Sequence, residues 1–325
     1  MKEPRVTVQI VTYNNEKTII DCIRSVQRQR NVSINLLVID SGSSDGTVAL
    51  MKAHDIRVIV LGKNVGYGAA HNIGFNQTKS EYVLTLNPDI LLKPDFLSAM
   101  VSAMDQAGSA AGSGQGMLFR VGMLGKSSRT IDSAGLYMTP YRRQGLRYEQ
   151  KEVSSVPTSI QEIFGPDGAA AFYRRSMLND INLGFGIFDE SYFMHKEDVD
   201  LIWRAQLRGW KSIFVPTAQA YHIRTFRAGH RAHIPPRLRM IAARNRYFLI
   251  AKNDDLALFV LALPWILLYE AAIITYMAVY ERESLQAYTL FLQQLPSLLR
   301  KRKVIQKKRK ASTIHMSRWF SWKRL

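Results

Sequence analysis

The sequence predicts an α/β fold in which a mostly parallel, Rossmann-like sheet is flanked by helices. Between residues 6 and 92, short apolar runs typical of buried strands alternate with segments whose apolar residues recur at helical spacing. A polar or glycine-rich loop follows each run. Strands and helices that alternate in this way form right-handed parallel units, and the loops after the strands gather at one edge of the sheet. We therefore expect a ligand site at that edge.

The first three strands are expected over residues 6–11, 34–39 and 56–61, which are rich in Val, Ile and Leu. A helix joins the first two strands, and its apolar face consists of Ile19, Cys22, Ile23 and Val26. The loops after these strands contain neither the Gly-x-Gly-x-x-Gly dinucleotide fingerprint nor a Walker-type phosphate loop. The sequence therefore does not favour a dehydrogenase or a P-loop enzyme.

Residues 81–92 form an apolar run that stops at Asn87-Pro88-Asp89. A carboxylate at the active edge of a sheet, beside an amide, is suited to hold a divalent ion against a diphosphate. Asp89 is therefore a candidate metal ligand. The alternative is an ordinary turn after a strand, because Asn, Pro and Asp are common turn residues.

Past Pro94 a helix is expected to about Gln106, and it is followed by a region rich in Gly and Ala, to about residue 125, in which no regular element is expected. Order returns over residues 163–175, where Asp167-Gly168 precedes a run of small residues. Small residues suit a closely packed strand, because they let backbones approach. The same residues suit the wall of a substrate pocket, and the sequence leaves both interpretations open.

Acidic residues cluster over residues 188–200, at the start of a helix expected to run to about Arg208. Acidic residues at a helix N-terminus are favourable through the helix dipole, which accounts structurally for some of them. Asp200 and Arg204, four residues apart, suit a simple surface pair. Asp198 instead shares a helix face with apolar residues, so it should point inward, where a carboxylate is a candidate general base.

The chain has 325 residues and a formal net charge of +18. Residues 300–325 contain eleven Lys and Arg and no Asp or Glu, which indicates an acidic partner, either anionic lipid or nucleic acid. A nucleic-acid-binding protein would interleave basic and aromatic residues across a folded face. Here the excess charge follows an apolar helix, which favours lipid over nucleic acid. The single cysteine, Cys22, and the lack of a signal-peptide pattern favour a reducing compartment.

Residues 256–280 are long and apolar enough to span a bilayer, but Pro264 and Glu270 interrupt them. One crossing would put the basic tail and the catalytic half on opposite sides, against the tendency of positive charge to stay cytoplasmic. We therefore expect helices that lie in the inner-leaflet interface at the cytoplasmic face, with the tail on an anionic membrane surface. A buried helical hairpin is the alternative. The expected divisions are residues 1–235, the catalytic domain, 236–299, the membrane-associated helices, and 300–325, the basic tail.

Taken together, the motifs resemble a family 2 glycosyltransferase with the GT-A fold, and more narrowly its rhamnosyltransferase-like branch. The resemblance covers about residues 6–222 and rests on an ordered set of short motifs. These are Thr12-Tyr13-Asn14, residues 40–47, residues 64–68 with Asn72 and Gly74, Asn87-Pro88-Asp89, Asp167-Gly168-Ala169, Phe188-Asp189-Glu190, Glu197-Asp198 and His222. Many members carry Asp-x-Asp where this chain has Asn87-Pro88-Asp89, so one carboxylate fewer faces the ion.

The resemblance implies an inverting transfer from a nucleotide-diphosphate sugar with Mg²⁺ or Mn²⁺. Asp40 would bind the base, and Thr12 and Tyr13 would line the nucleoside pocket. Asp89 would bind the ion, and Asp198 would take the proton of the acceptor hydroxyl. His222 would contact the metal or the diphosphate. The alternative is that His222 is a packed structural residue. The other residues expected to contact substrate are Asn14, Ser41, Asn64, Gly66, Asn72, Asn87, Asp167, Gly168 and Glu197.

A dTDP-rhamnose donor is the leading implication of the resemblance, and UDP-sugars stay open. The expected membrane location suggests a lipid-linked glycan acceptor, such as a polyprenyl-diphosphate sugar in cell-envelope polysaccharide synthesis. A basic segment could meet the acceptor's diphosphate, or could be a loop on the membrane surface; it consists of Arg224, Arg227, His230, Arg231 and His233. A non-catalytic relative that binds sugar nucleotides as a scaffold is a further alternative.

Overall fold

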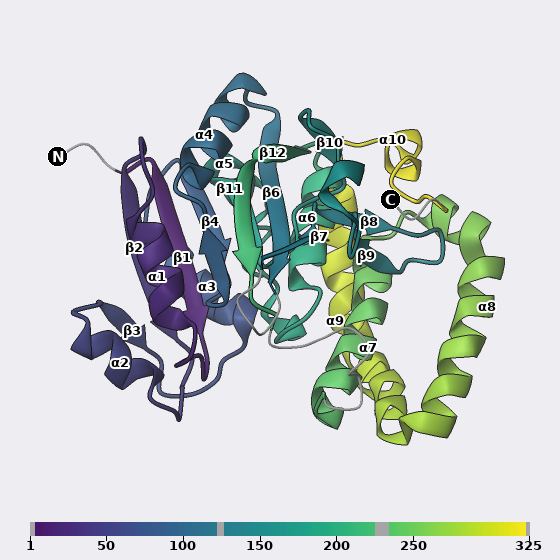
Figure 1. Ribbon diagram of the computed structural model, residues 1–325. Coiled ribbons are helices and arrows are strands. Elements are labelled where there is room, and N and C mark those ends of the chain that lie inside the picture. The colour runs from purple at the N-terminus through teal and green to yellow at the C-terminus, as the bar shows by residue number, and fades with distance from the viewer. Residues whose placement is uncertain (1–3, 122–126, 225–233, 323–325) are drawn as a thin grey trace.

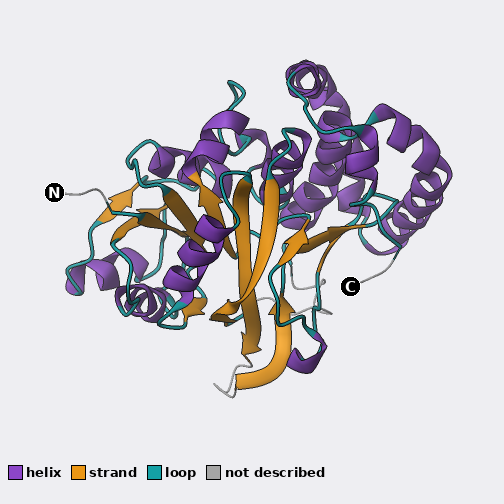
Figure 2. Ribbon diagram, turned by 90° about the horizontal axis from the view of Figure 1, so that it is seen from above, coloured by secondary structure: helices purple, strands orange, loops and turns teal. Residues whose placement is uncertain are grey.

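The computed structural model describes residues 4–121, 127–224 and 234–322, which form a mixed ten-stranded sheet with helices on both faces (Figure 1; Figure 2). The strand order is β10-β12-β6-β11-β4-β1-β2-β3, while β5 pairs with β12 and β7 pairs with β6. The predicted α/β architecture is confirmed. One half of the sheet is parallel and the other half is mixed.

The parallel half is built around β1, which pairs with β2 on one side and β4 on the other. Every residue of β1 is buried, which explains its continuous apolar run. β3 is shorter than predicted, because it lies at the sheet edge and its last residue, Val60, is half exposed. The elements of this half are β1 Val6–Thr12, α1 Ile19–Gln27, β2 Ile34–Asp40, α2 Thr47–Ala53, β3 Val58–Val60, α3 Tyr67–Phe75 and β4 Tyr82–Leu86.

The Gly- and Ala-rich region contains the long strand β6, Ala111–Val121, so the expectation of no regular element there was wrong; residues 122–126 lie outside the described residues. The first eight residues of β6 are buried on both faces, so no polar alternation marks the strand. A Cβ atom on Gly114 would lie 2.6 Å from Met100, and one on Gly116 would lie 2.5 Å from Phe96. Glycine is present because helix α4 packs directly against the backbone of this strand.

The apolar run of residues 81–92 forms two strands that flank the Asn87-Pro88-Asp89 turn, namely β4 and β5 (Ile90–Leu92). β5 pairs antiparallel with the end of β12 (Lys211–His222), with Ile90 opposite His222. This register brings His222 to Asp89. The remaining elements of this region are α4 Phe96–Gln106, β7 Ser127–Ser133, β8 Leu136–Met138, β9 Gln144–Leu146, η1 Val153–Ser155, β10 Gln161–Ile163, β11 Ala170–Arg174, α5 Arg175–Ile181, η2 Glu190–Tyr192 and α6 Glu197–Leu207.

Helices form the C-terminal part of the chain: α7 Pro236–Asn253, α8 Leu256–Tyr280, η4 Arg282–Leu285, α9 Gln286–Lys307 and α10 Thr313–Ser317. α7 and α9 pack against α6 of the sheet domain, whereas α8 runs along the outer edge of the molecule (Figure 1). Among the described residues α8 is the one helix long and apolar enough to cross a membrane, and little of it is buried.

The boundary predicted between residues 299 and 300 falls inside α9, which continues to Lys307 because Lys and Arg are good helix formers. Part of the expected basic tail is packed rather than solvated. Ion pairs join Lys301 to Asp189 and Arg309 to Asp255. Lys301 therefore fastens α9 to the sheet domain, and Arg309 fastens the end of the tail to the start of α8.

Candidate active site

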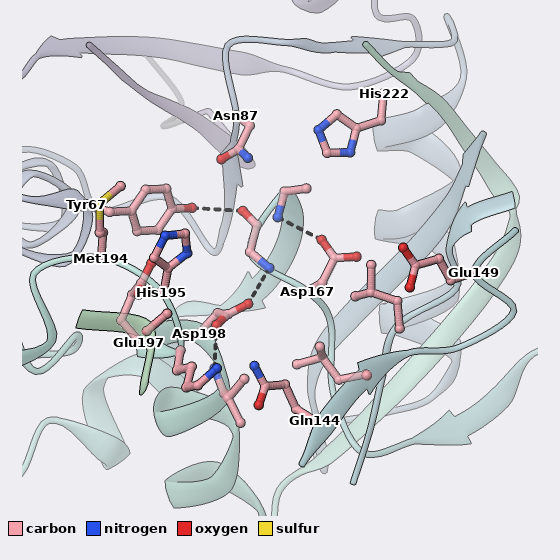
Figure 3. Close-up of a pocket in the computed structure, with 18 of the residues that line it drawn as sticks. Tyr67, Asn87, Gln144, Glu149, Asp167, Met194, His195, Glu197, Asp198 and His222 are labelled. Carbon is pink, nitrogen blue, oxygen red and sulfur yellow. Dashed lines mark hydrogen bonds between the residues drawn. The ribbon is translucent and has the colours of Figure 1, made fainter. Parts of the chain in front are cut away.

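A cavity of about 580 Å³ opens where β4, β11 and β12 end or begin (Figure 3). Its polar floor comes from the loop before β11 and from the start of α6, and a β8–β9 hairpin and α7 close its outer side. The lining residues are Tyr67, Asn87, Leu136, Arg143, Gln144, Gly145, Leu146, Glu149, Asp167, Gly168, Ala169, Met194, His195, Lys196, Glu197, Asp198, Val199, His222, Arg224 and Ala242.

Seven of the residues predicted from the sequence line this cavity: Asn87, Asp167, Gly168, Glu197, Asp198, His222 and Arg224. Asp89 lies beside it, with Oδ1 at 3.4 Å from Nε2 of His222. The other predicted substrate contacts lie outside the cavity, at the ends of β1 and β2, in the loops after β1, β2 and β3, and in α3. They are Thr12, Tyr13, Asn14, Asp40, Ser41, Asn64, Gly66 and Asn72.

Asp198 enters the cavity from the first turn of α6. Its Oδ2 accepts a 2.8 Å hydrogen bond from the backbone N–H of Gly168, which holds the carboxylate against the loop before β11. A Cβ atom on Gly168 would lie 3.2 Å from that same oxygen, so glycine permits this close approach. Burial raises the pKa of the Asp198 carboxyl. A carboxylate with a raised pKa at the wall of a cavity is suited to take up a proton.

Two further buried carboxyl groups face the same cavity. Oε2 of Glu197 and Oδ2 of Asp167 make no hydrogen bond to any described part of the chain. Burial, together with the charge of Asp198, raises the pKa of Glu197 to about 8, and burial also raises the pKa of Asp167. A buried polar atom without a partner costs free energy, so these oxygens are sites where the hydroxyl groups of a sugar would gain hydrogen bonds.

His222 lies between two aspartates. Nδ1 donates a 2.8 Å hydrogen bond to Asp132 of β7, while Nε2 faces Asp89. Burial lowers the pKa of His222, but its bonds to Asp132 and Asp89 outweigh burial and raise the pKa to about 9. Arg224 also donates to Asp132, which is fully buried. Asp132 cannot be recognised as a site residue from the sequence, because no known motif precedes it and its strand follows a segment with no predicted element.

The described residues contain no group of three or more His, Cys, Asp or Glu side chains arranged to hold a metal ion. Asp89 and His222 do present one carboxylate oxygen and one imidazole nitrogen toward each other. These donor types fit a divalent ion that takes its remaining ligands from a diphosphate and water. Of the basic segment predicted to meet the acceptor's diphosphate, only Arg224 is described, and it lines the cavity.

The loops after β1 and β2 are bonded to each other. The Asp40 carboxylate accepts from the backbone N–H groups of Gly42 and Ser43, and Oδ1 of Asn14 accepts from the backbone of Ser44. Oγ of Ser41 accepts from the backbone N–H of Val65, which ties the third loop to the second. Thr12 is buried and Tyr13 is half exposed. The base-binding role of Asp40 stays a prediction, since its carboxylate is bonded within its own loop.

The loop after β3 and helix α3 contact the acidic segment. Oδ1 of Asn64 accepts a hydrogen bond from the backbone N–H of Gly66. Gly66 has a φ of +88° and lies against Phe193, and both features require glycine. The Asn72 amide bonds to the backbone N–H and C=O of Phe188 and to Glu190. Asn72 therefore joins two chain segments in this structure, and its predicted contact with substrate stays a prediction.

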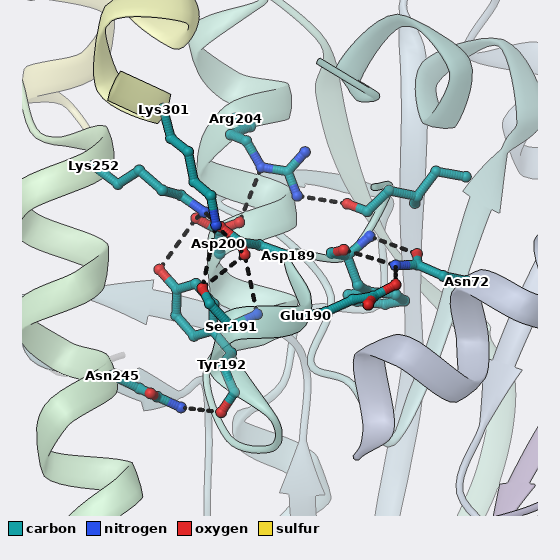
Figure 4. A network of polar contacts seen from close by, with 12 residues as sticks. Asn72, Asp189, Glu190, Ser191, Tyr192, Asp200, Arg204, Asn245, Lys252 and Lys301 are labelled. Carbon is teal, nitrogen blue, oxygen red and sulfur yellow. Dashed lines mark hydrogen bonds and ion pairs between the residues drawn. The ribbon is translucent and has the colours of Figure 1, made fainter. Parts of the chain in front are cut away.

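Asp200 and Arg204 are not the surface pair expected from their spacing, because both side chains are fully buried (Figure 4). Lys252 of α7 lies 2.8 Å from Asp200 and 2.5 Å from Asp189. Lys301 of α9 also pairs with Asp189. Burial raises the pKa of each aspartate, but Lys252 with Lys301 at Asp189, and Lys252 with Arg204 at Asp200, outweigh burial, so the pKa of both carboxyls lies below its usual range. The spacing of Asp200 and Arg204 wrongly predicted a surface position, because the helices that cover them, α7 and α9, come later in the chain.

The sheet topology, with its cavity at the carboxyl ends of parallel strands, is that of the GT-A fold. A mannosyltransferase from Pyrobaculum calidifontis in complex with GDP-Man and Mn²⁺ superposes with a TM-score of 0.53 and 18% identity, over 95% of this chain and 86% of that chain. S. aureus TarS 1–349 in complex with UDP-GlcNAc superposes with a TM-score of 0.57 and 17% identity, over 94% and 89%.

The chain belongs to glycosyl transferase family 2, whose family model matches residues 7–181. An N-acetylglucosaminyl-diphospho-decaprenol L-rhamnosyltransferase of Mycobacterium tuberculosis is 27% identical over 254 residues, which cover 70% of this chain and 76% of that protein. The succinoglycan biosynthesis protein ExoO of Rhizobium meliloti is 32% identical over 142 residues, which cover 43% of this chain and 40% of that protein. The predicted family is confirmed.

Proposed function

We propose that this glycosyltransferase moves L-rhamnose from dTDP-rhamnose to a polyprenyl-diphosphate-linked glycan, with inversion, in cell-envelope polysaccharide synthesis. The observation that carries the proposal is the similarity, over 70% of the chain, to a mycobacterial enzyme named as an L-rhamnosyltransferase acting on a decaprenol-diphosphate sugar. The carboxylate-rich cavity supports it, because such a cavity suits the hydroxyl groups of a sugar and one proton acceptor.

Asp198 acts as the general base in the proposed reaction. As the acceptor oxygen bonds to the anomeric carbon, its proton passes to Asp198, and the bond from that carbon to the diphosphate breaks with its electron pair on the leaving oxygen. Attack from the face opposite the leaving group inverts the configuration, without a covalent enzyme intermediate. The hydrogen bond from Gly168 fixes the carboxylate for this transfer.

Asp89 and His222 would hold Mg²⁺ or Mn²⁺, which supplies positive charge beside the leaving diphosphate. The presence of Mn²⁺ in the similar mannosyltransferase structure supports a divalent ion of this kind. Asp132 keeps the imidazole of His222 oriented, with Nδ1 occupied and Nε2 turned toward Asp89.

The proposed location is the cytoplasmic face of the cell membrane, with α8 lying in the interface. The outward side of α8 exposes Leu261, Leu267 and Leu268, which suit the boundary between headgroups and acyl chains. Glu270, near the middle of the helix, is bonded to Arg246 of α7 and Tyr288 of α9. These bonds hold one side of α8 to the protein, so the helix would meet lipid on its other side. Outward cations of α9, such as Arg300 and Lys303, would contact anionic headgroups.

The test is release of nucleoside diphosphate by the detergent-purified chain from dTDP-, UDP- and GDP-sugars, with Mg²⁺, Mn²⁺ or chelator and a polyprenyl-diphosphate sugar as acceptor. Turnover of dTDP-rhamnose that needs the acceptor and the metal supports the proposal. Asp198→Asn should lower turnover about 10²–10⁴-fold. Full activity of that variant would remove the assignment of the base.

A UDP-sugar-dependent transferase is the second candidate, favoured by the similar TarS structure with UDP-GlcNAc. The same donor panel separates the two, since preferred turnover of a UDP-sugar would replace rhamnose transfer. A non-catalytic sugar-nucleotide-binding protein would bind donor and turn over none of them.

A further inference from the structure

The segment that leads into Asp198 has an unusual backbone. Phe193, His195 and Lys196 have φ values of 64°, 66° and 70°, a region that residues with side chains rarely adopt. They stand directly before Glu197 and Asp198, and His195 and Lys196 line the cavity. Backbone of this kind persists only where neighbouring groups hold it, and it is concentrated at functional sites.

Two neighbouring residues of α7 hold this segment: Arg244 donates to the carbonyls of Ser191 and Tyr192, and Asn245 reaches furthest toward Asp198. The Nδ2 atom of Asn245 lies 2.9 Å from the carbonyl oxygen of Tyr192 (Figure 4). It also lies 2.9 Å from the carbonyl oxygen of Met194 and 2.8 Å from that of His195, so two N–H groups serve three carbonyls. The Asn245 side chain is fully buried. Arg244 donates to Oδ1 of Asn245, and this bond keeps the NH₂ group turned toward the segment.

A continuous series of hydrogen bonds connects the segment with the proposed base. The carbonyl of Phe193 accepts a 2.8 Å bond from the backbone N–H of Tyr67 at the start of α3. The Tyr67 hydroxyl donates 2.9 Å to the carbonyl of Gly168, and the Gly168 N–H donates 2.8 Å to Asp198. Asp198 is therefore fixed both by the peptide chain that precedes it and through Tyr67.

We propose that Asn245 is a positioning residue for the Asp198 base, and that α7 thereby belongs to the catalytic unit. The inference rests on the proposed function of Asp198. Asn245 lies outside residues 7–181 matched by the family model, and it does not line the cavity. It acts through the 191–196 segment, not by contact with substrate.

Asn245→Asp is the most informative variant, because it keeps the shape of the side chain and replaces the NH₂ donor with an acceptor that faces three carbonyls. Asn245→Ala removes the donor without adding charge. Leu249→Ala is the matched control: Leu249 is a buried residue of the same helix whose apolar side chain makes no hydrogen bond to the segment, and its loss creates a cavity. All three are assayed as full chains in detergent below their melting temperatures, and Asp198→Asn is assayed beside them.

Both Asn245 variants should lower kcat at least about tenfold, as expected when a catalytic group is displaced, while the Kd for dTDP changes less than twofold. Hydrogen exchange of residues 192–196 should quicken in both. Leu249→Ala should lower Tm while leaving kcat and segment exchange as in the wild type. Equal losses of kcat in Asn245→Ala and Leu249→Ala, or unchanged exchange in the segment, would overturn the positioning role. If Asp198→Asn keeps wild-type activity, the assignment of Asp198 as the base is wrong, and the positioning role defined through it is wrong as well. If Asp198→Asn is inactive but both Asn245 variants keep wild-type activity, only the positioning role is wrong.

Discussion

Nδ1 of His222 donates a 2.8 Å hydrogen bond to Asp132, and the opposite ring nitrogen lies 3.4 Å from Asp89. Asp132 belongs to β7 and Asp89 to the turn between β4 and β5, and the imidazole connects the two carboxylates. Asp132 has no direct access to solvent, and it also accepts from Arg224. It therefore holds the ring in one orientation, with Nε2 presented to the place where a diphosphate-bound ion would lie.

The first prediction concerns Asp132→Asn. Loss of a carboxylate that orients a metal-binding histidine typically weakens metal affinity about 10–100-fold. We expect such a loss for Mn²⁺ in the presence of dTDP, measured by electron paramagnetic resonance of free Mn²⁺. Asp21→Asn, at an exposed carboxylate of α1, is the control and should bind Mn²⁺ as the wild type does. Equal Mn²⁺ affinity in both variants would show that Asp132 has only a packing role.

The parallel half of the sheet could be predicted from sequence, because each of its strands and helices is marked by a pattern of neighbouring residues. β1 and β4 are buried along their whole length, and α1 places its apolar residues on one face. Each of these patterns can be recognised within a dozen residues. The loops after the strands were located for the same reason, since a parallel sheet brings its carboxyl ends to one edge.

The strands of the mixed half and their partners could not be predicted, because they depend on contacts between segments that are far apart in the chain. β6 has no alternation, since its faces are covered by α4 on one side and by α5 on the other. Asp132 acquires its role only when β12 brings His222 across the sheet. Asp200 is buried by α7, which begins more than thirty residues later in the chain.

The second prediction is a pH dependence of stability that comes from Glu197. Burial raises its pKa in the folded state to about 8, against about 4.3 in an unfolded chain. The folded state therefore binds the proton more tightly, and the stability gained from this is present below about pH 4 and is lost as pH rises toward about 8. Glu197→Gln removes the titration. We expect its Tm to exceed that of the wild type at pH 9 by several degrees, and the difference to shrink at pH 5.

The experiment is thermal unfolding of both chains in the same detergent at each pH. Glu190→Gln serves as the control for loss of one carboxylate from the same segment. Because Glu190 is exposed, its variant should follow the wild type across the pH range. A constant Tm difference between Glu197→Gln and wild type would contradict the raised pKa.

The third prediction compares two glycines of one loop. Gly66 and Gly62 both have positive φ, but a Cβ atom on Gly66 would lie 2.4 Å from the carbonyl oxygen of Phe193, whereas one on Gly62 would meet nothing within 4 Å. Gly62→Ala should cost only backbone strain, about 1–2 kcal/mol. Gly66→Ala should cost more and should also lower turnover, because the loop is pushed away from the segment before Asp198. Equal losses of stability and activity in the two variants would rule out the close contact as the cause.

The fourth prediction separates the two sides of α8. Glu270 is a partly buried polar tie between this apolar helix and the protein, through Arg246, Tyr247 and Tyr288. Glu270→Ala leaves those partners without their acceptor, so we expect the free energy of unfolding to fall by about 2 kcal/mol or more. Its binding to vesicles should persist, since the outward apolar residues are unchanged.

Leu261→Lys and Leu268→Lys change the outward side instead. Both leucines are more than half exposed, so lysine there should leave Tm close to that of the wild type. Each lysine would either be buried at the headgroup boundary or lift that turn of the helix toward water. Binding to vesicles, measured by flotation, should therefore weaken. Wild-type flotation of the double variant would assign membrane contact to another surface. Lost flotation in Glu270→Ala alone would instead mean that α8 must be held against α7 and α9 to reach the bilayer.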